Sequence, residues 1–308
     1  MKVFSSLDAA AASKELEGAA VCLGNFDGVH LGHRALIDEA RKNGKAAALT
    51  FTPHPGKVLQ PDLAPRLITL LPHKLELLEQ AGLDWAIVQP FTLDYARTTA
   101  QAFEESLLDG LEVRTIVVGY DFTYGTKRSG TVKTLEEACA RRGAKLSVVP
   151  AVTVDGVVVS SSRVREYVLE GRVAAAQRLL GRYFDLEGTV VPGAGRGRTI
   201  GFPTANIDTQ NELRPGAGVY AVRVHVRGKP ERYGGAANIG VKPTFGGGEV
   251  TIEAHLFDFQ GDLYGKKLIV EFIDRLRGEQ RFASVSELSG QIARDIEAAR
   301  TALARAAS

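Results

Sequence analysis

The sequence predicts a two-domain α/β protein in which a parallel sheet with helices on both faces precedes a small antiparallel β-barrel. The chain of 308 residues exceeds the usual size of one compact core. Its first half alternates short apolar runs with amphipathic segments of helical period, which is typical of a parallel sheet. Its second half has closely spaced strand-like runs between turns rich in Gly and Pro, which is typical of a small barrel.

The elements of the first domain follow from these runs. Buried strands are expected at 19–24, 46–51, 84–91, 114–119 and 145–150. Helices are expected at 31–44, 73–82, 99–111 and 134–143. The first of these helices carries Leu36, Ile37 and Ala40 at the spacing of one helical face. We expect this domain to span residues 1–184.

The second domain is expected to span residues 185–308. Its strands are expected at 186–191, 218–228, 231–240, 249–257 and 266–277. Val222, Val224 and Val226 alternate with polar residues, as in a strand with one buried face. A final amphipathic helix is expected after Ser284 or Ser286, either of which could cap its first turn.

Composition and charge exclude several function classes. A net charge of +2 does not suggest a nucleic-acid-binding surface, because such domains concentrate basic residues on one face. Cys22 and Cys139 form no CxxC pattern, so we expect reduced, buried thiols rather than a zinc site or disulfide. Neither a secretory leader nor an apolar run of about 18 residues is recognisable. The expected location is the cytoplasm, with neither nucleic acid nor membrane as a partner.

The stretch GNFDGVHLGH follows the first predicted strand, where α/β proteins bind ligands. His30 and His33 could bind a metal, but zinc needs a third protein ligand that the stretch does not supply. They could also be core residues. Phosphate binding fits better, because a helix starting near Leu31 directs backbone N–H groups at an anion. Gly28 and Gly32 would let the backbone turn and approach the ligand.

A second candidate anion site is VSSSRVREYVLEG at 159–171. Three serines precede a helix that carries Arg163 and Arg165, which adds guanidinium donors to the helix N-terminus. Taken alone, such serines are usually caps and such arginines are usually solvated. The combination with HLGH favours phosphate binding.

GNFDGVHLGH and SSSRVR, with FTPHP and VVGYDFTYG between them, resemble the HxGH nucleotidyltransferases, specifically the adenylyltransferase module of bacterial bifunctional riboflavin kinase/FMN adenylyltransferases. The resemblance implies transfer of AMP from ATP to FMN, which forms FAD and pyrophosphate, with His30, His33 and Arg165 as catalytic residues. It further implies an ATP site of Gly24, Asn25, Phe26, Asp27, Gly28, His30, His33, Ser161, Ser162 and Arg165. The flavin site would include Pro53, His54 and Asp121. Two positions depart from the family pattern, namely Ser162 in place of a threonine and Thr123 in place of a frequent arginine.

The stretch GAGRGRTIGFPTANI at 193–207 does not fit the dinucleotide fingerprint, because Ile200 stands where the last glycine is needed. A flexible turn or a nucleic-acid contact remains open on the residues alone. GFPTAN resembles the signature of riboflavin kinases, which implies phosphorylation of riboflavin to FMN by ATP. The resemblance implies ATP binding by Gly195, Arg196, Gly197, Gly201, Thr204 and Asn206, with Thr204 and Asn206 also holding Mg²⁺. It implies Glu253 as catalytic base and a flavin site that includes Gly218, Tyr220 and Arg275.

Two alternatives belong to other function classes. The HxGH domain could serve another acceptor, such as a phosphopantetheine- or glycerol-phosphate-type substrate, but GFPTAN with Glu253 argues against it. The barrel could instead be an RNA-binding module beside a degraded nucleotide sensor. The intact His30, His33, Arg165, Thr204 and Glu253 argue against degeneration.

Overall fold

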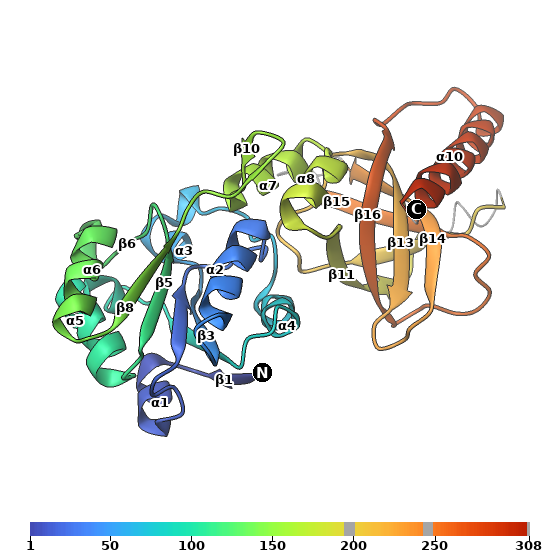
Figure 1. Ribbon diagram of the computed structural model, residues 1–308. Helices are drawn as coiled ribbons and strands as arrows, with labels where there is room; N and C mark the ends of the chain where they lie inside the picture. Colours follow the sequence, from blue (N-terminus) through green and yellow to red (C-terminus); the bar gives the residue numbers. More distant parts are fainter. Residues whose placement is uncertain (194–200, 243–248, 307–308) are drawn as a thin grey trace. The chain divides into compact units, whose positions relative to one another are not determined.

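The computed structural model describes residues 1–193, 201–242 and 249–306. The chain divides into two compact units, Met1–Ser161 and Ser162–Ser308. The first unit is a parallel α/β domain and the second contains a closed antiparallel barrel. The predicted fold class is therefore confirmed, and both units can be followed in Figure 1.

The sheet of the first unit has six parallel strands in the order β1-β4-β3-β2-β5-β8. Their bounds are Lys2–Phe4, Trp85–Pro90, Ala46–Thr52, Ala20–Leu23, Thr115–Gly119 and Lys145–Val149 in that order. The chain leaves β2 toward β3 and β4 on one side and later returns to place β5 and β8 on the other. The gap between β2 and β5 is thus the topological switch point, where such sheets bind ligands. The short edge strand β1 was not among the expected elements.

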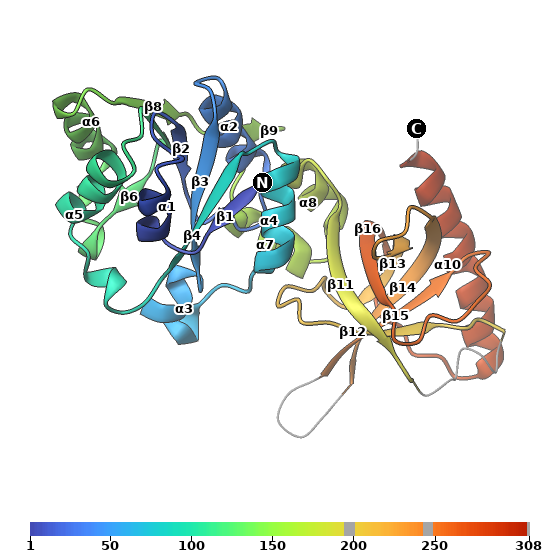
Figure 2. The same ribbon diagram turned by 90° about the horizontal axis from the view of Figure 1, so that it is seen from below.

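Helices cover both faces of this sheet, because alternate residues of each strand point to opposite sides. On one face, Ala20 and Cys22 of β2 belong to a core shared with α2 (Leu31–Arg41) and α4 (Leu71–Gln80). On the other, Val21 and Leu23 join the core under α1, α5, the adjoining η3 turn and α6. These elements span Leu7–Ser13, Ala100–Glu105, Ser106–Gly110 and Val132–Arg141. Figure 2 shows α4 on the opposite side of the sheet from α1 and α5.

Short elements line the carboxyl edge of the sheet. After β3 come α3 (Pro55–Leu59) and the single turn η1 (Pro61–Leu63), and after β4 comes η2 (Tyr95–Arg97). Two small hairpins follow β5 and β8. The first pairs β6 (Thr123–Tyr124) with β7 (Gly130–Thr131) around the turn η4 (Thr126–Arg128), and the second pairs β9 (Thr153–Val154) with β10 (Val157–Val158).

The second unit begins with α7 (Ser161–Leu169), whose first residue still belongs to the first unit, and α8 (Val173–Leu180). Its barrel closes in the order β11-β12-β15-β14-β13-β16. These strands span Phe184–Val191, Ala205–Asp208, Glu249–Leu256, Arg232–Lys242, Gly218–Val226 and Lys267–Arg277. The sequence predicted five of them. It missed β12, which has four residues and only Ala205 and Ile207 facing the core.

The terminal helix α10 (Val285–Arg305) packs along β13 and β14 (Figure 1). Ser284 is its N-cap, since its hydroxyl accepts the Glu287 N–H at 3.2 Å, so one of the two expected caps is confirmed. The helix is tied to the barrel by Arg277 of β16. Its guanidinium donates to both carboxylate oxygens of Asp295, with Nη2 to Oδ2 at 2.7 Å and Nε to Oδ1 at 3.0 Å. Across the described parts of the chain, no helix combines the length and apolar character needed to cross a membrane.

Candidate active sites

The first candidate site lies at the switch point of the parallel sheet. Here the loop after β2 carries GNFDGVH, and β5 ends at Gly119 beside it. A pocket of about 270 Å³ opens at this edge. Five of the residues predicted for the adenylyltransferase site line it, namely Gly24, His30, His33, Asp121 and Ser161. The remaining lining residues are Leu23, Gly32, Leu36, Gly119, Tyr120, Phe122 and the segments 149–152 and 158–160.

The two histidines are held by the first turn of α2. His30 is the N-cap residue, and its Nδ1 accepts the backbone N–H of His33 at 3.2 Å. The two imidazole rings stack with centroids 3.7 Å apart and planes inclined by 13°. Because Nδ1 of His30 accepts this bond, the proton of the neutral ring is on Nε2, which is therefore a hydrogen-bond donor. A side chain at Gly32 would begin 3.1 Å from the His30 ring, so glycine leaves room for this arrangement.

Most of the turn between β2 and His30 does not line the pocket, although Gly24 does. Asn25, Phe26, Asp27 and Gly28 are not among the residues that line the pocket. Phe26 is fully buried, and the carboxylate of Asp27 accepts the backbone N–H groups of Ile68 and Thr69 at 3.0 and 3.2 Å. Asp27 therefore anchors the turn to the segment that precedes α4.

The predicted flavin residues of the first unit are divided between two places. Asp121 lines the pocket with the histidines, whereas Pro53 and His54 follow β3 and do not line it. The Thr52–Pro53 peptide bond is cis. His54 caps α3, because its Nδ1 accepts the Gly56 N–H at 3.1 Å.

The serine and arginine motif lies across the boundary between the units. Ser161 donates its hydroxyl proton to the carbonyl of Asp27 at 2.9 Å, which joins it to the turn after β2. Ser162 and Arg165 lie on α7 in the second unit. Arg163 of the same helix forms an ion pair with Glu166 at 2.6 Å, which lies within α7 itself.

The second candidate site lies on the outer surface of the barrel. Asn206 of β12 and Asn238 of β14 both stand opposite Glu253 of β15. Residues directly opposite in antiparallel strands project from the same face. Ile252 and Ala254 fill the barrel interior, so Glu253 projects outward together with the two asparagines.

Other predicted residues of this site fall around the same strands. Thr204 immediately precedes β12 and is half-buried. Gly201 has a φ of +86°, which favours glycine. Gly193 was not predicted, yet a Cβ there would lie 2.0 Å from Nδ2 of Asn206, so only glycine leaves room for this amide. Gly195, Arg196 and Gly197 lie outside the described residues.

The predicted flavin residues of the barrel have clear structural roles. Tyr220 is fully buried, packs against Phe272 and donates its hydroxyl to the Gly216 carbonyl. Burial raises the pKa of this phenol to about 12. Gly218 has a φ of +153°, and a side chain there would strike the carbonyl of residue 277 at 2.5 Å. Arg275 is exposed and donates to the Ala217 carbonyl at 2.7 Å, which secures the entry into β13.

Sequence reasoning missed Lys74, and it gave no individual role to Gly193 and Asn238, although they lie in the stretches 193–207 and 238–247 that it did single out. Asn238 stands beside Glu253, Gly193 packs on Asn206, and Lys74 of α4 donates to the Asn25 carbonyl at 2.9 Å. Strand alternation could have placed Asn238 on the outer face. The contacts of Gly193 and Lys74 join distant segments, so no pattern within one segment predicted them.

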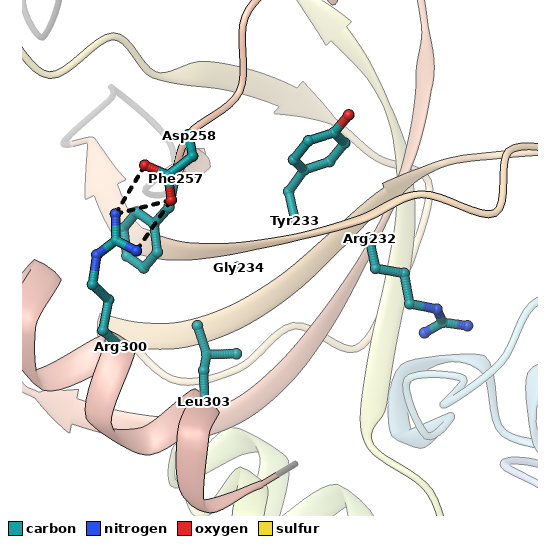
Figure 3. Close-up of a pocket in the computed structure, with 7 residues that line it drawn as sticks. All are labelled: Arg232, Tyr233, Gly234, Phe257, Asp258, Arg300 and Leu303. Carbon is teal, nitrogen blue, oxygen red and sulfur yellow. Dashed lines mark hydrogen bonds and ion pairs between the residues drawn. The ribbon is translucent and has the colours of Figure 1, made fainter.

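A further pocket of about 380 Å³ lies where α10 meets the ends of β14 and β15 (Figure 3). It contains none of the predicted site residues. Arg300 forms a double hydrogen bond with Asp258 and lies 4.6 Å from the ring centre of Phe257, while Leu303 faces Gly234. These contacts belong to the packing of the terminal helix on the barrel.

Comparison with known proteins matches both units. A family model described as FAD synthetase covers residues 12–163, and one described as Riboflavin kinase covers residues 180–303. A bifunctional riboflavin kinase/FMN adenylyltransferase from Escherichia coli (strain K12) is 40% identical over 285 residues, which is 91% of each chain. The protein of the same name from Bacillus subtilis (strain 168) is 39% identical over 292 residues, which is 92% of each chain.

The fold also matches a solved structure over its length. The crystal structure of a macrolide-efflux protein from Streptococcus pneumoniae aligns with a TM-score of 0.87 and 31% identity, covering 97% of this chain and 98% of that one. The resemblance drawn from the sequence motifs is confirmed by the two family matches and the relatives that cover nearly the whole chain. This chain belongs to the family of bifunctional riboflavin kinase/FMN adenylyltransferases.

Proposed function

We propose that this chain phosphorylates riboflavin to FMN in its barrel domain and adenylylates FMN to FAD in its parallel-sheet domain, with ATP as co-substrate of both steps. The observation that carries the proposal is the placement of the family motifs. His30 and His33 share a pocket at the switch point of the sheet, and Asn206 stands beside Glu253 on the barrel. The two sites belong to different compact units.

Adenylylation needs little acid–base chemistry. The phosphate of FMN is already an anion near neutral pH, so one of its oxygens attacks the α-phosphorus of ATP directly. A new P–O bond forms, and the bond to the bridging oxygen of pyrophosphate breaks. The site must therefore align the two phosphates and stabilise the charge on the leaving group. His30 suits this role because its Nε2–H is a donor at the N-terminus of α2.

The remaining groups at the first site complete the proposal. Gly24 and Ser161 stand beside the histidines to receive ATP, and Arg165 with Ser162 supplies donors to its phosphates. The turn between β2 and α2 would position the pocket residues through Asn25, Phe26, Asp27 and Gly28. Pro53, His54 and Asp121 would contact the flavin. The support for these roles is the match to the family motifs.

Riboflavin phosphorylation differs because its nucleophile is a neutral alcohol. Glu253 would accept the proton of the ribityl hydroxyl as its oxygen bonds to the γ-phosphorus of ATP and ADP leaves. The oxygens of Thr204 and Asn206 are hard ligands that fit Mg²⁺, and Gly193 leaves room for the amide of Asn206. Bound there, the ion would neutralise charge on the phosphates.

The proposal also covers the domain boundary, the remaining kinase residues and the cellular location. We place the division between the two catalytic domains at residues 184 and 185, where the first barrel strand begins at Phe184. Gly195, Arg196, Gly197 and Gly201 would cover the ATP phosphates of the kinase, and Gly218, Tyr220 and Arg275 would shape its flavin site. The protein is proposed to act in the cytoplasm on flavins and ATP. Its net charge of +2 argues against nucleic acid as a partner.

Chromatography of a reaction containing the full chain, riboflavin, ATP and Mg²⁺ tests the proposal. FMN should appear first and FAD later, because FMN is the substrate of the second step. Omitting Mg²⁺ and adding a chelator should stop FMN formation. Absence of both flavin products in the complete reaction would refute the proposed function. FMN without FAD would refute the adenylylation half, and FAD formed only from added FMN would refute the kinase half.

A further inference from the structure

We propose that Lys74 is a positioning residue of the adenylylation site, whose buried ammonium group holds the GNFDG turn and thereby places His30 in the pocket. The inference rests on the proposed adenylylation of FMN. Lys74 lies on α4, outside every motif that the sequence singled out. It is only 7% exposed, which is rare for lysine.

The ammonium group of Lys74 is directed at the turn. Its Nζ donates to the carbonyl oxygen of Asn25 at 2.9 Å and to the hydroxyl of Thr50 at 3.2 Å. The Thr50 hydroxyl in turn donates to the same Asn25 carbonyl at 2.9 Å. Two donors from α4 and β3 therefore converge on one carbonyl of the turn. Since the peptide unit is planar, this contact also fixes the plane that continues to Phe26.

The segment that leads into α4 holds the turn at two further points. The carboxylate of Asp27 accepts the N–H groups of Ile68 and Thr69, at 3.0 and 3.2 Å. The Thr69 hydroxyl accepts the N–H of Gly28 at 3.1 Å. Asp27 is 1% exposed and its negative charge lies close enough to Lys74 to favour the ammonium form. The buried cation thus has an opposite charge on the turn that it holds.

The turn needs external support because its backbone is strained. Phe26 has a φ of +49° and Val29 a φ of +40°, in the left-handed region that non-glycine residues rarely adopt. Val29 is β-branched, for which this conformation is an outlier. Such backbone persists only where the surrounding structure determines it. Val29 immediately precedes His30, so release of the turn would change where the imidazole lies.

A buried apolar residue would fill the same space without the desolvation that an ammonium group incurs. Burial does lower the pKa of Lys74 below its usual range. The hydrogen bonds that Nζ donates to the Asn25 carbonyl and the Thr50 hydroxyl distinguish a positioning role from simple packing. A packing role predicts lower stability without a selective loss of one activity, and this difference can be measured.

The test compares Lys74→Met with Lys74→Arg, Thr50→Val and the control Lys133→Met. Lys133 is an exposed lysine of α6 in the same unit, so its variant makes the same change in charge and side-chain length. Each full chain is assayed for FAD formation from FMN with ATP varied, and for FMN formation from riboflavin. Thermal unfolding and hydrogen exchange of the segment 24–33 are measured on the same samples.

Lys74→Met should raise the KM for ATP in adenylylation and lower kcat/KM by about tenfold or more. Its riboflavin kinase constants should stay within about twofold, since that site lies in the other unit. Hydrogen exchange of 24–33 should quicken. Lys74→Arg, which keeps the charge, should lose less, and Thr50→Val should show a smaller loss of the same kind. Lys133→Met should match the unaltered chain.

Adenylylation constants of Lys74→Met within about twofold of the unaltered chain would overturn the inference, whatever its unfolding temperature. If Lys74→Met does not fold, unaltered constants and exchange in Thr50→Val would overturn it. If the unaltered chain forms no FAD, the proposed function fails instead. Hydrogen exchange still decides the inference in that case, because unchanged exchange at 24–33 would show that Lys74 does not hold the turn.

Discussion

Glu253→Gln should separate the two activities of this chain. The substitution keeps the shape of the side chain and removes its ability to accept a proton. Within the residues that the structure describes, the Glu253 carboxylate has no hydrogen bond or ion pair, and it projects from the outer face of β15 beside Asn206 and Asn238. These contacts give no reason to expect that the Glu253 charge stabilises the fold.

The geometry sets the expected size of both effects. Loss of a general base typically costs about 10²- to 10⁴-fold in rate, which corresponds to about 3–5 kcal/mol in activation free energy. Loss of an outward carboxylate without partners should change the free energy of unfolding by less than about 0.5 kcal/mol. We therefore expect a folded protein whose riboflavin phosphorylation falls by about 10²-fold or more.

The assay follows FMN formed from riboflavin and, separately, FAD formed from added FMN. The second reaction serves as an internal control, because its site lies in the other compact unit. Glu231→Gln is the matched control variant, since Glu231 is exposed just before β14 and loses the same charge. Denaturant unfolding of both variants measures their stability.

Three results would refute the reasoning. Riboflavin phosphorylation within about threefold of the unaltered chain would show that Glu253 is not the base. Loss of both activities in a protein of unchanged stability would show that the two sites are not separate. A loss equal in Glu231→Gln and Glu253→Gln would assign the effect to net charge alone.

Three further predictions concern other parts of the chain. His30→Ala should lower FAD formation by about 10²-fold while FMN formation persists, and loss of the Nδ1 cap should cost about 1 kcal/mol in denaturant unfolding; equal loss of both activities would contradict it. Asp295→Ala should destabilise the barrel by about 3 kcal/mol because it leaves the Arg277 guanidinium uncompensated, and a change below about 1 kcal/mol would show that the pair is not needed. Burial raises the pKa of Cys22 to about 12 and of Cys139 to about 11, so iodoacetamide at pH 8 should label both only after unfolding. Because unfolded thiols lose protons first, these residues should also lower stability as the pH rises above about 9, and labelling of the native chain at pH 8 would contradict the assignment.

Much of the fold could be predicted because its signals are local. The runs at 46–51 and 114–119 are mostly apolar, and β3 (Ala46–Thr52) and β5 (Thr115–Gly119) form there. Ser284 offered a hydroxyl just before an amphipathic segment and became the cap of α10. The strand β12 had no such signal, because its four residues depend on pairing with β11 and β15.

The candidate sites divide in the same way. GNFDGVHLGH and GFPTAN are contiguous, so the sequence by itself determined the residue types, their spacing and the family. Only the tertiary structure decided that Lys74 reaches the Asn25 carbonyl, that the Asp27 carboxylate binds backbone N–H groups before α4, and that Tyr220 is a core residue. Lys74 and Asn25 are 49 residues apart, and Asn206 meets Glu253 through strand register. Such contacts follow from how distant segments pack, which the periodicity within any one segment does not specify.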